Sequence, residues 1–198
     1  MSSKPSPVGS RSVLALEPQR RLSVDEYHRM IAAGVLDEDE RLELLEGVIV
    51  EMSPQKPRHA EVISRLADPR FVAVGADIVV RVQMPLTLGP ASEPEPDVAL
   101  VARTPGGYRE RHPTHALLVI EVSGESLHQD RVAKASIYAG AGIPEYAIVN
   151  LVEECVELRR DPDPASSLYR SLAVLGPADR FESASVSGFA FRVGDLLA

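Results

Sequence analysis

Two carboxylates and a lysine lie within one stretch of the chain, residues 93–150. Glu121 interrupts the apolar run 115–122, which is typical of a strand that is buried on both faces. A buried carboxylate is costly unless it has a partner, which can be a cation, a metal ion or a proton. Asp97 precedes the apolar segment 98–102, and Lys134 follows on a segment with helical spacing. Such a set around a strand end can hold a divalent metal ion beside a phosphate.

Some of these residues also have a plain structural interpretation. Asp97 follows a proline, and aspartate is common in turns at the start of a strand. Asp130 and Lys134 are four residues apart, so they can form an ordinary ion pair along a helix. Glu121 is harder to explain in this way, because a carboxylate inside an apolar strand needs a partner. Strand alternation places Ser123 on the same face of the strand as Glu121.

The elements around these residues follow from periodicity, caps and breakers. The capping box formed by Ser23 and Glu26 predicts a helix over 24–33 that ends at Gly34. The acidic run 37–40 and the leucine-rich segment 41–46 predict a second short helix, which ends at Gly47. We expect strands over 48–52, 78–84 and 98–102, and a short helix over 59–66.

The second half of the chain predicts a crossover unit. A central strand over 116–122, a helix over 129–139 and a strand over 146–152 follow one another with short links, which places the two strands parallel. The segments 154–160 and 168–174 predict a hairpin around the turn 161–164. The fold class is therefore α/β, with a central mixed β-sheet flanked by helices.

Length and composition predict one folded domain. The chain has 198 residues with 44% hydrophobic and 25% charged residues, as in ordinary globular proteins. Residues 1–21 are rich in Ser, Pro and Arg and predict a flexible tail, and residues 22–198 form the domain. There is no membrane-length apolar stretch and no signal-peptide pattern, so we expect a cytoplasmic protein without a membrane partner. The lone Cys155 excludes an internal disulfide and a cysteine-based zinc site.

The charge balance limits how the protein could bind nucleic acid. The net charge of −8 argues against a broad basic surface for non-specific binding. It does not exclude a nuclease, because a bound metal ion supplies positive charge to an acidic pocket.

Four blocks of the sequence follow one another in a specific order: LELLEGVIVEMSP together with His59, SEPEPDVALV, LLVIEVSGESLHQDRVAKASIYA and GIPEYAIVN. Together they closely resemble the Uma2 family (DUF820). The resemblance covers about residues 22–195, and its specificity lies in the order of the blocks. The family is grouped with restriction endonucleases in the PD-(D/E)xK nuclease-like superfamily. The resemblance therefore implies a restriction-endonuclease-like core.

The resemblance also implies roles for particular residues. Asp97 matches the aspartate of the Pro-Asp motif, and Glu121 matches the second carboxylate. The superfamily's lysine normally stands two residues after that glutamate, where this chain has Ser123, and Lys134 on the following helix takes its place. Glu43 matches a glutamate on the family's N-terminal helix. Asp97, Glu121 and the main-chain carbonyl of Val122 would be the metal ligands.

The family resemblance and the residue chemistry lead to the same hypothesis. We expect a Mg²⁺-dependent endonuclease that hydrolyses DNA phosphodiester bonds, with Mn²⁺ as a substitute metal. Lys134 would assist the reaction, and Glu43 would complete the metal shell or hold a water. The alternative is an inactive nuclease-like fold that serves as a binding or regulatory module. A metal-free carboxylate enzyme such as a glycosidase fits less well, because a lysine suits phosphate better. A homodimer is an expectation by analogy, and His59 can be polar surface or catalytic.

Overall fold

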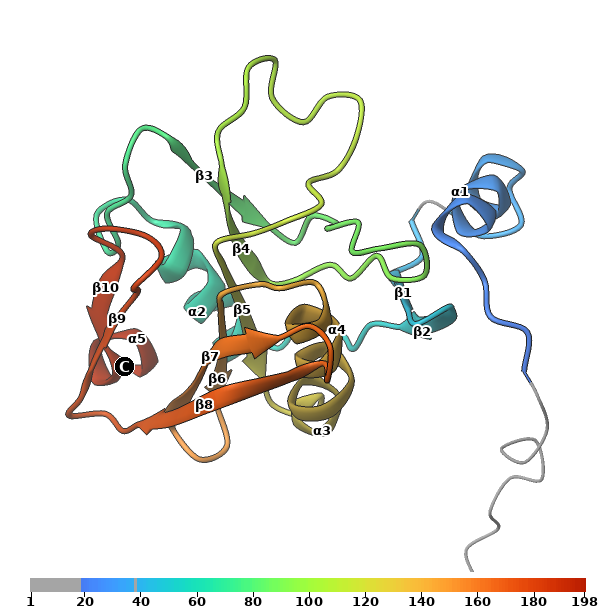
Figure 1. The fold of residues 1–198 in the computed structure, drawn as a ribbon. Helices are drawn as coiled ribbons and strands as arrows, with labels where there is room; N and C mark the ends of the chain where they lie inside the picture. The colour runs from blue at the N-terminus through green and yellow to red at the C-terminus, as the bar shows by residue number, and fades with distance from the viewer. Residues whose placement is uncertain (1–18, 38) are drawn as a thin grey trace, which may run out of the picture.

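A six-stranded mixed sheet forms the centre of the molecule in a computed structural model, which describes residues 19–37 and 39–198 (Figure 1). The strand order is β3-β4-β5-β6-β7-β8. Only β5 and β6 run parallel, and the other neighbouring strands are antiparallel. The strands are β3 Ile78–Val82, β4 Val98–Ala102, β5 Leu118–Ser123, β6 Glu145–Asn150, β7 Cys155–Asp163 and β8 Leu168–Leu175. This confirms the predicted α/β class with a central mixed sheet.

The two central strands are buried on both faces, as their composition requires. Every residue of β5 and β6 is buried. Their parallel pairing needs a crossover connection, which the helical segment between them supplies. The predicted crossover unit is therefore confirmed, and so is the hairpin of β7 and β8, although its turn lies after Asp163 rather than at 161–164.

Each face of the sheet packs against its own helices (Figure 1). On one face, Leu118, Ile120 and Val122 join a core with α2 (Pro57–Ala67) and α5 (Val193–Leu197). On the other face, Val119 packs with α4 (Ala135–Gly140). Successive side chains of β5 thus enter opposite layers, as strand geometry requires. Glu121 has the same parity as Val119 and leaves β5 toward the α4 layer.

The helix before β6 contains a π-helical turn. It begins as α3 (Leu127–Gln129), continues as η2 (Asp130–Lys134) and ends as α4 at Gly140. The predicted single helix over 129–139 is close to these combined bounds, but the wider turn was not predicted. π-turns are rare and occur frequently at functional sites. Here the turn carries Asp130 and Lys134, which are both buried.

The N-terminal part pairs a helix with a small hairpin. Helix α1 (Val24–Ala32) begins at the predicted capping box, in which the Ser23 side chain accepts from the Glu26 N–H. The predicted second helix over 37–46 is wrong, because Leu42–Leu45 forms strand β1 and pairs with β2 (Val48–Glu51). Glu43 therefore lies on a strand and not on a helix.

The turn of this hairpin explains the error. Glu46 and Gly47 connect β1 to β2, and both have positive φ, 49° and 77°. Two such residues form the tight turn whose twist matches an antiparallel pair, and glycine favours it. Gly47 also packs closely against Arg21, since a Cβ added to Gly47 would lie 2.6 Å from the Arg21 Cβ. The Glu-Gly pair is thus a hairpin signal rather than a helix end.

A second small hairpin lies near the C-terminal end of the described chain. Strands β9 (Arg180–Glu182) and β10 (Ala190–Arg192) form a second small hairpin beside α5. The predicted flexible tail 1–21 lies outside the described residues except for 19–21. None of the helices in the described ranges is long and apolar enough to cross a membrane.

Candidate functional site

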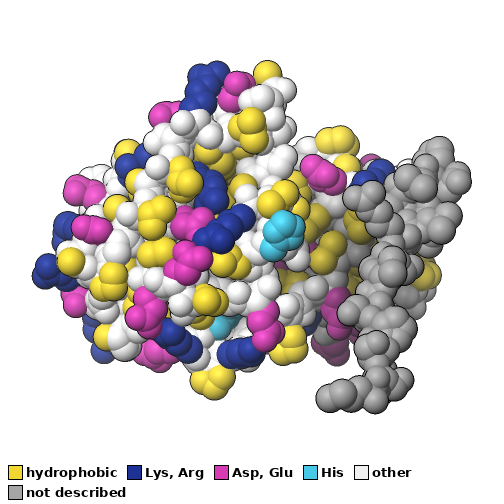
Figure 2. All heavy atoms as spheres, turned by 90° about the horizontal axis from the view of Figure 1, so that it is seen from below, with side chains coloured by type: hydrophobic (Ala, Val, Ile, Leu, Met, Phe, Trp, Pro, Cys, Tyr) yellow, Lys and Arg dark blue, Asp and Glu magenta, His cyan; other side chains and the backbone are white. Residues whose placement is uncertain are grey.

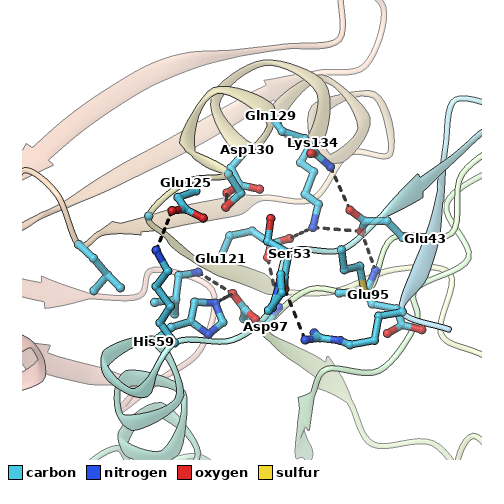
Figure 3. Close-up of a pocket in the computed structure, with 18 of the residues that line it drawn as sticks. Glu43, Ser53, His59, Glu95, Asp97, Glu121, Glu125, Gln129, Asp130 and Lys134 are labelled. Atoms are coloured by element: carbon cyan, nitrogen blue, oxygen red, sulfur yellow. Dashed lines mark hydrogen bonds and ion pairs between the residues drawn. The ribbon is translucent and has the colours of Figure 1, made fainter. Parts of the chain in front are cut away.

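A cavity of about 350 Å³ lies where four parts of the fold meet (Figure 3). These are the β1–β2 hairpin, the start of α2, the ends of β4 and β5, and the helix α3–η2. The antiparallel register of Val98 with Ile120 puts the residue before β4 beside Glu121 of β5. The structure therefore brings all the residues selected from the sequence to one cavity. They are Glu43, Asp97, Glu121, Val122 and Lys134.

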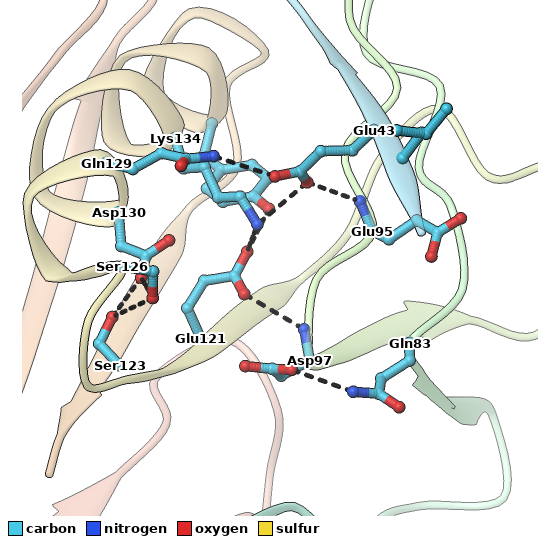
Figure 4. Close-up of polar contacts among 12 residues, drawn as sticks. Glu43, Gln83, Glu95, Asp97, Glu121, Ser123, Ser126, Gln129, Asp130 and Lys134 are labelled. Carbon is cyan, nitrogen blue, oxygen red and sulfur yellow. Dashed lines mark hydrogen bonds and ion pairs between the residues drawn. The ribbon is translucent and has the colours of Figure 1, made fainter. Parts of the chain in front are cut away.

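Glu121 is buried and receives hydrogen bonds on both carboxylate oxygens. Its Oε1 accepts from the Lys134 ammonium at 3.0 Å and from the Tyr138 hydroxyl at 2.7 Å. Its Oε2 accepts from the Asp97 backbone N–H at 3.3 Å (Figure 4). The partner that a buried carboxylate requires is thus present on the Oε1 side. The Oε2 side faces Asp97.

Asp97 is held from three directions. Its Oδ2 accepts from the Val122 backbone N–H at 2.8 Å and lies 3.1 Å from His59 Nε2. Its Oδ1 accepts from the Gln83 side-chain amide at 3.3 Å. A turn residue alone would not need these partners. The fixed carboxylate at the start of β4 instead resembles a preorganised ligand.

Lys134 crosses from the π-turn to two carboxylates of other elements. Its Nζ lies 3.0 Å from Glu121 Oε1 and 3.1 Å from Glu43 Oε2, and its side chain is 6% exposed. Glu43 is also held by Gln129, whose side-chain amide donates to Oε1 at 3.1 Å. Glu43 thus sits beside the ammonium.

The ordinary helical pairing of Asp130 with Lys134 is not what the structure contains. Asp130 instead accepts from the hydroxyls of Ser126, at 2.8 Å, and Ser123. The predicted common face of Glu121 and Ser123 is confirmed, since both side chains reach the same helix (Figure 4).

The electrostatics of the cavity are dominated by negative charge. Burial raises the pKa of Glu121 to about 8; Lys134 opposes this shift, whereas Asp130, Asp97 and Glu43 add to it. Burial alone would lower the pKa of Lys134, but Glu121 and Glu43 raise it above its ordinary value. Lys134 therefore keeps its proton across the neutral pH range, and Glu121 gives up its proton less readily than an ordinary carboxyl group does.

The oxygen donors fit a hard cation such as Mg²⁺ or Mn²⁺ better than a softer metal ion such as Zn²⁺ or Cu²⁺. Among the residues that the structure describes, no group of three or more His, Cys, Asp or Glu side chains is arranged to hold a metal ion. Asp97 and Glu121 would therefore need a backbone oxygen and waters beside them. Mg²⁺ is bound in this way, through one or two carboxylates while it keeps several waters. Val122 lines the same cavity.

The rim of the cavity carries two ion pairs and Arg41, whose guanidinium donates to the Ser53 carbonyl at 3.5 Å. Lys56 lies 2.7 Å from Glu125, and Arg58 lies 2.7 Å from Glu154. On the face shown in Figure 2, acidic and basic side chains are likewise intermixed with apolar ones. A bound cation would therefore be an important source of uncompensated positive charge for a phosphate.

Sequence reasoning missed two residues that hold the site. Gln83 and Gln129 are amides on other elements, and no local pattern in the sequence links them to Asp97 or Glu43. Tyr138 follows Lys134 by four residues, and this helical spacing does indicate that both side chains lie near Glu121, which each of them contacts. The interpretation of His59 stayed open, and its ring lies against Asp97.

The comparisons with known proteins agree with this fold. The family model Uma2, described as "Putative restriction endonuclease", matches residues 24–194. No curated protein matches the chain. Among solved structures, the chain is similar to "a putative nuclease belonging to DUF820" from Anabaena variabilis, with 18% identity and a TM-score of 0.69. The similarity covers 89% of this chain and 97% of that chain, and at this identity it concerns the fold. Because the family model spans most of its length, the chain belongs to the Uma2 family.

Proposed function

We propose that this protein is a Mg²⁺-dependent endonuclease that hydrolyses DNA phosphodiester bonds at the cavity of Figure 3. The observation that carries the proposal is the meeting of Asp97, Glu121 and Lys134 in one cavity from three separate elements. Two carboxylates beside a buried ammonium suit a phosphate with its counter-cation better than a neutral sugar. Family membership supports the same reaction class.

Asp97 and Glu121 would hold the metal ion, together with the carbonyl of Val122. When bound, a divalent cation neutralises phosphate charge and lowers the pKa of water. The His59 ring and the Val122 N–H keep Asp97 in place before the cation arrives. Such preorganisation reduces the reorganisation required during the reaction.

Lys134 acts as a hydrogen-bond donor and not as a base. Glu121 and Glu43 hold its pKa above the ordinary value, so it keeps its proton at any working pH. Two of its three N–H directions are accounted for by Glu121 and Glu43. The third can donate to a phosphate oxygen, where charge builds up in the transition state.

A plasmid-cleavage assay tests the proposal. Wild-type protein with Mg²⁺ or Mn²⁺ should nick or cut supercoiled DNA, and EDTA should stop it. Asp97→Asn should lower the rate by about 100-fold or more, because it removes a ligand charge without changing shape. Asp161→Asn is the matched control, since Asp161 is exposed in the β7–β8 hairpin and lies outside the cavity.

The alternative function predicts a different result. If supercoiled, linear and single-stranded DNA all stay intact with either metal, and calorimetry detects no metal binding, the nuclease proposal is wrong. The protein would then be a binding module with a nuclease fold. Cleavage that persists in Asp97→Asn would contradict the assignment of the site.

A further inference from the structure

The ammonium of Lys134 sits where a bridging cation could sit. It lies between Glu121 Oε1 at 3.0 Å and Glu43 Oε2 at 3.1 Å, which come from β5 and β1. All three side chains are almost completely buried, at 4%, 2% and 6% exposed. Two buried carboxylates from distant strands thus face one positive charge. We call this cation-binding position a seat, and the cation that occupies it here is the ammonium group of Lys134.

The two oxygens of Glu121 face different partners. Oε1 faces Lys134, whereas Oε2 faces the backbone of Asp97 (Figure 4). Glu121 therefore borders two seats: one beside Asp97, where the proposed metal ion would bind, and one beside Glu43, which Lys134 occupies. Nucleases that use two metal ions place them about 3.5–4 Å apart around such shared carboxylates.

We propose that Lys134 fills the second of these seats as a tethered cation, so that the wild-type site binds a single divalent ion beside Asp97. This inference rests on the proposed function, because it concerns the same metal site. The tether gives the ammonium a high local concentration at the seat. Its charge also repels a second divalent ion, and this repulsion is strong where water is largely excluded.

The proposal gives Glu43 a role different from the one predicted from the sequence. Both oxygens of Glu43 already have partners: Gln129 at Oε1, and Lys134 and the Glu95 N–H at Oε2. Glu43 is thus a positioning residue that holds the ammonium, and the single divalent ion does not need it as a ligand.

Counting bound Mn²⁺ by EPR during a titration tests the proposal without any activity measurement. Wild-type protein should bind one Mn²⁺ per chain. Lys134→Ala vacates the seat and should bind two, whose spectra broaden because the two spins lie within a few ångströms. Lys134→Ala combined with Glu43→Gln removes the vacated seat and should bind one again. Val132→Ala is the control, since Val132 is exposed on the same π-turn.

The outcomes separate this inference from the proposed function. Two ions in the wild-type protein, or one in a folded Lys134→Ala variant, overturn the inference and leave the proposed Mg²⁺-dependent nuclease function standing. No ion in the wild-type protein overturns both. Glu43→Gln decides the matter if Lys134→Ala fails to fold. It should keep one ion with unchanged affinity, and a tenfold weaker affinity would make Glu43 a ligand and overturn the inference.

Discussion

Replacing Glu121 by glutamine should make the metal-free protein more stable relative to the wild type as the pH rises. The glutamine carbonyl can still accept from Lys134 and Tyr138 at the Oε1 position, whereas its NH₂ group cannot accept from the Asp97 N–H at the Oε2 position, a loss that is the same at every pH. Glutamine cannot carry the buried negative charge that Asp97, Asp130 and Glu43 oppose. The difference in unfolding free energy between the variant and the wild type therefore isolates the ionisation of one group.

The size of this difference follows from the raised pKa of Glu121, about 8 in the folded protein against an ordinary value of 4.5. An acid with a higher pKa in the folded state binds its proton more tightly there. Its stabilising contribution is complete below about pH 4.5 and is lost as the pH rises through about 8. At roughly 1.4 kcal/mol per pKa unit, the wild type loses about 5 kcal/mol over this range relative to the glutamine variant.

Urea unfolding in EDTA at pH 5 to 9 measures the effect. The stability advantage of Glu121→Gln should grow by roughly 1.4 kcal/mol per pH unit up to pH 8 and then level off. Glu61→Gln is the control, because Glu61 is exposed on α2 and outside the cavity. An advantage that stays flat with pH would show that Glu121 is not strained as a carboxylate, and would refute the electrostatic account of the site.

Three other predictions follow from the same geometry. Binding of Mg²⁺ at pH 7 should release close to one proton from Glu121, which calorimetry in buffers of different ionisation enthalpy can measure; zero release would contradict the raised pKa. Tyr138→Phe should lower the unfolding free energy by about 1–3 kcal/mol, because it removes the buried 2.7 Å hydrogen bond from Tyr138 to the Glu121 carboxylate. An unchanged midpoint of urea unfolding would argue against this hydrogen bond. Gly47→Ala should lower the unfolding free energy by more than about 1 kcal/mol, because φ is 77° and the new Cβ would lie 2.6 Å from the Arg21 Cβ. It should also weaken the hydrogen-exchange protection of the hairpin that carries Glu43, and unchanged protection would exclude this strain.

Burial patterns made the centre of the fold predictable from sequence. The strand over 98–102 has the predicted bounds, and the apolar runs around Glu121 and Ile148 give the parallel pair. A carboxylate within such a run required a partner, and this physical demand led to the cavity that contains Asp97, Glu121 and Lys134. The chemical roles of these residues stay predictions.

The other parts of the fold and the site could not be predicted, because they depend on contacts between residues that are far apart in the sequence. Residues 41–46 have helical composition, yet a two-residue turn at Glu46 and Gly47 makes them a strand, so tertiary pairing overrides local propensity. The π-turn over 130–134 leaves no local mark in the sequence. Gln83 and Gln129 are brought to the site only by the fold, and amides in sequence carry no sign of such a role.

The most direct test of the metal site is a crystal of this protein soaked in Mn²⁺ and measured at the manganese absorption edge. We expect one anomalous peak per chain, with carboxylate oxygens of Asp97 and Glu121 about 2.2 Å from it and Lys134 still between Glu121 and Glu43. A cavity without a peak, or a peak that is bound by Glu43 and not by Asp97, would contradict the account.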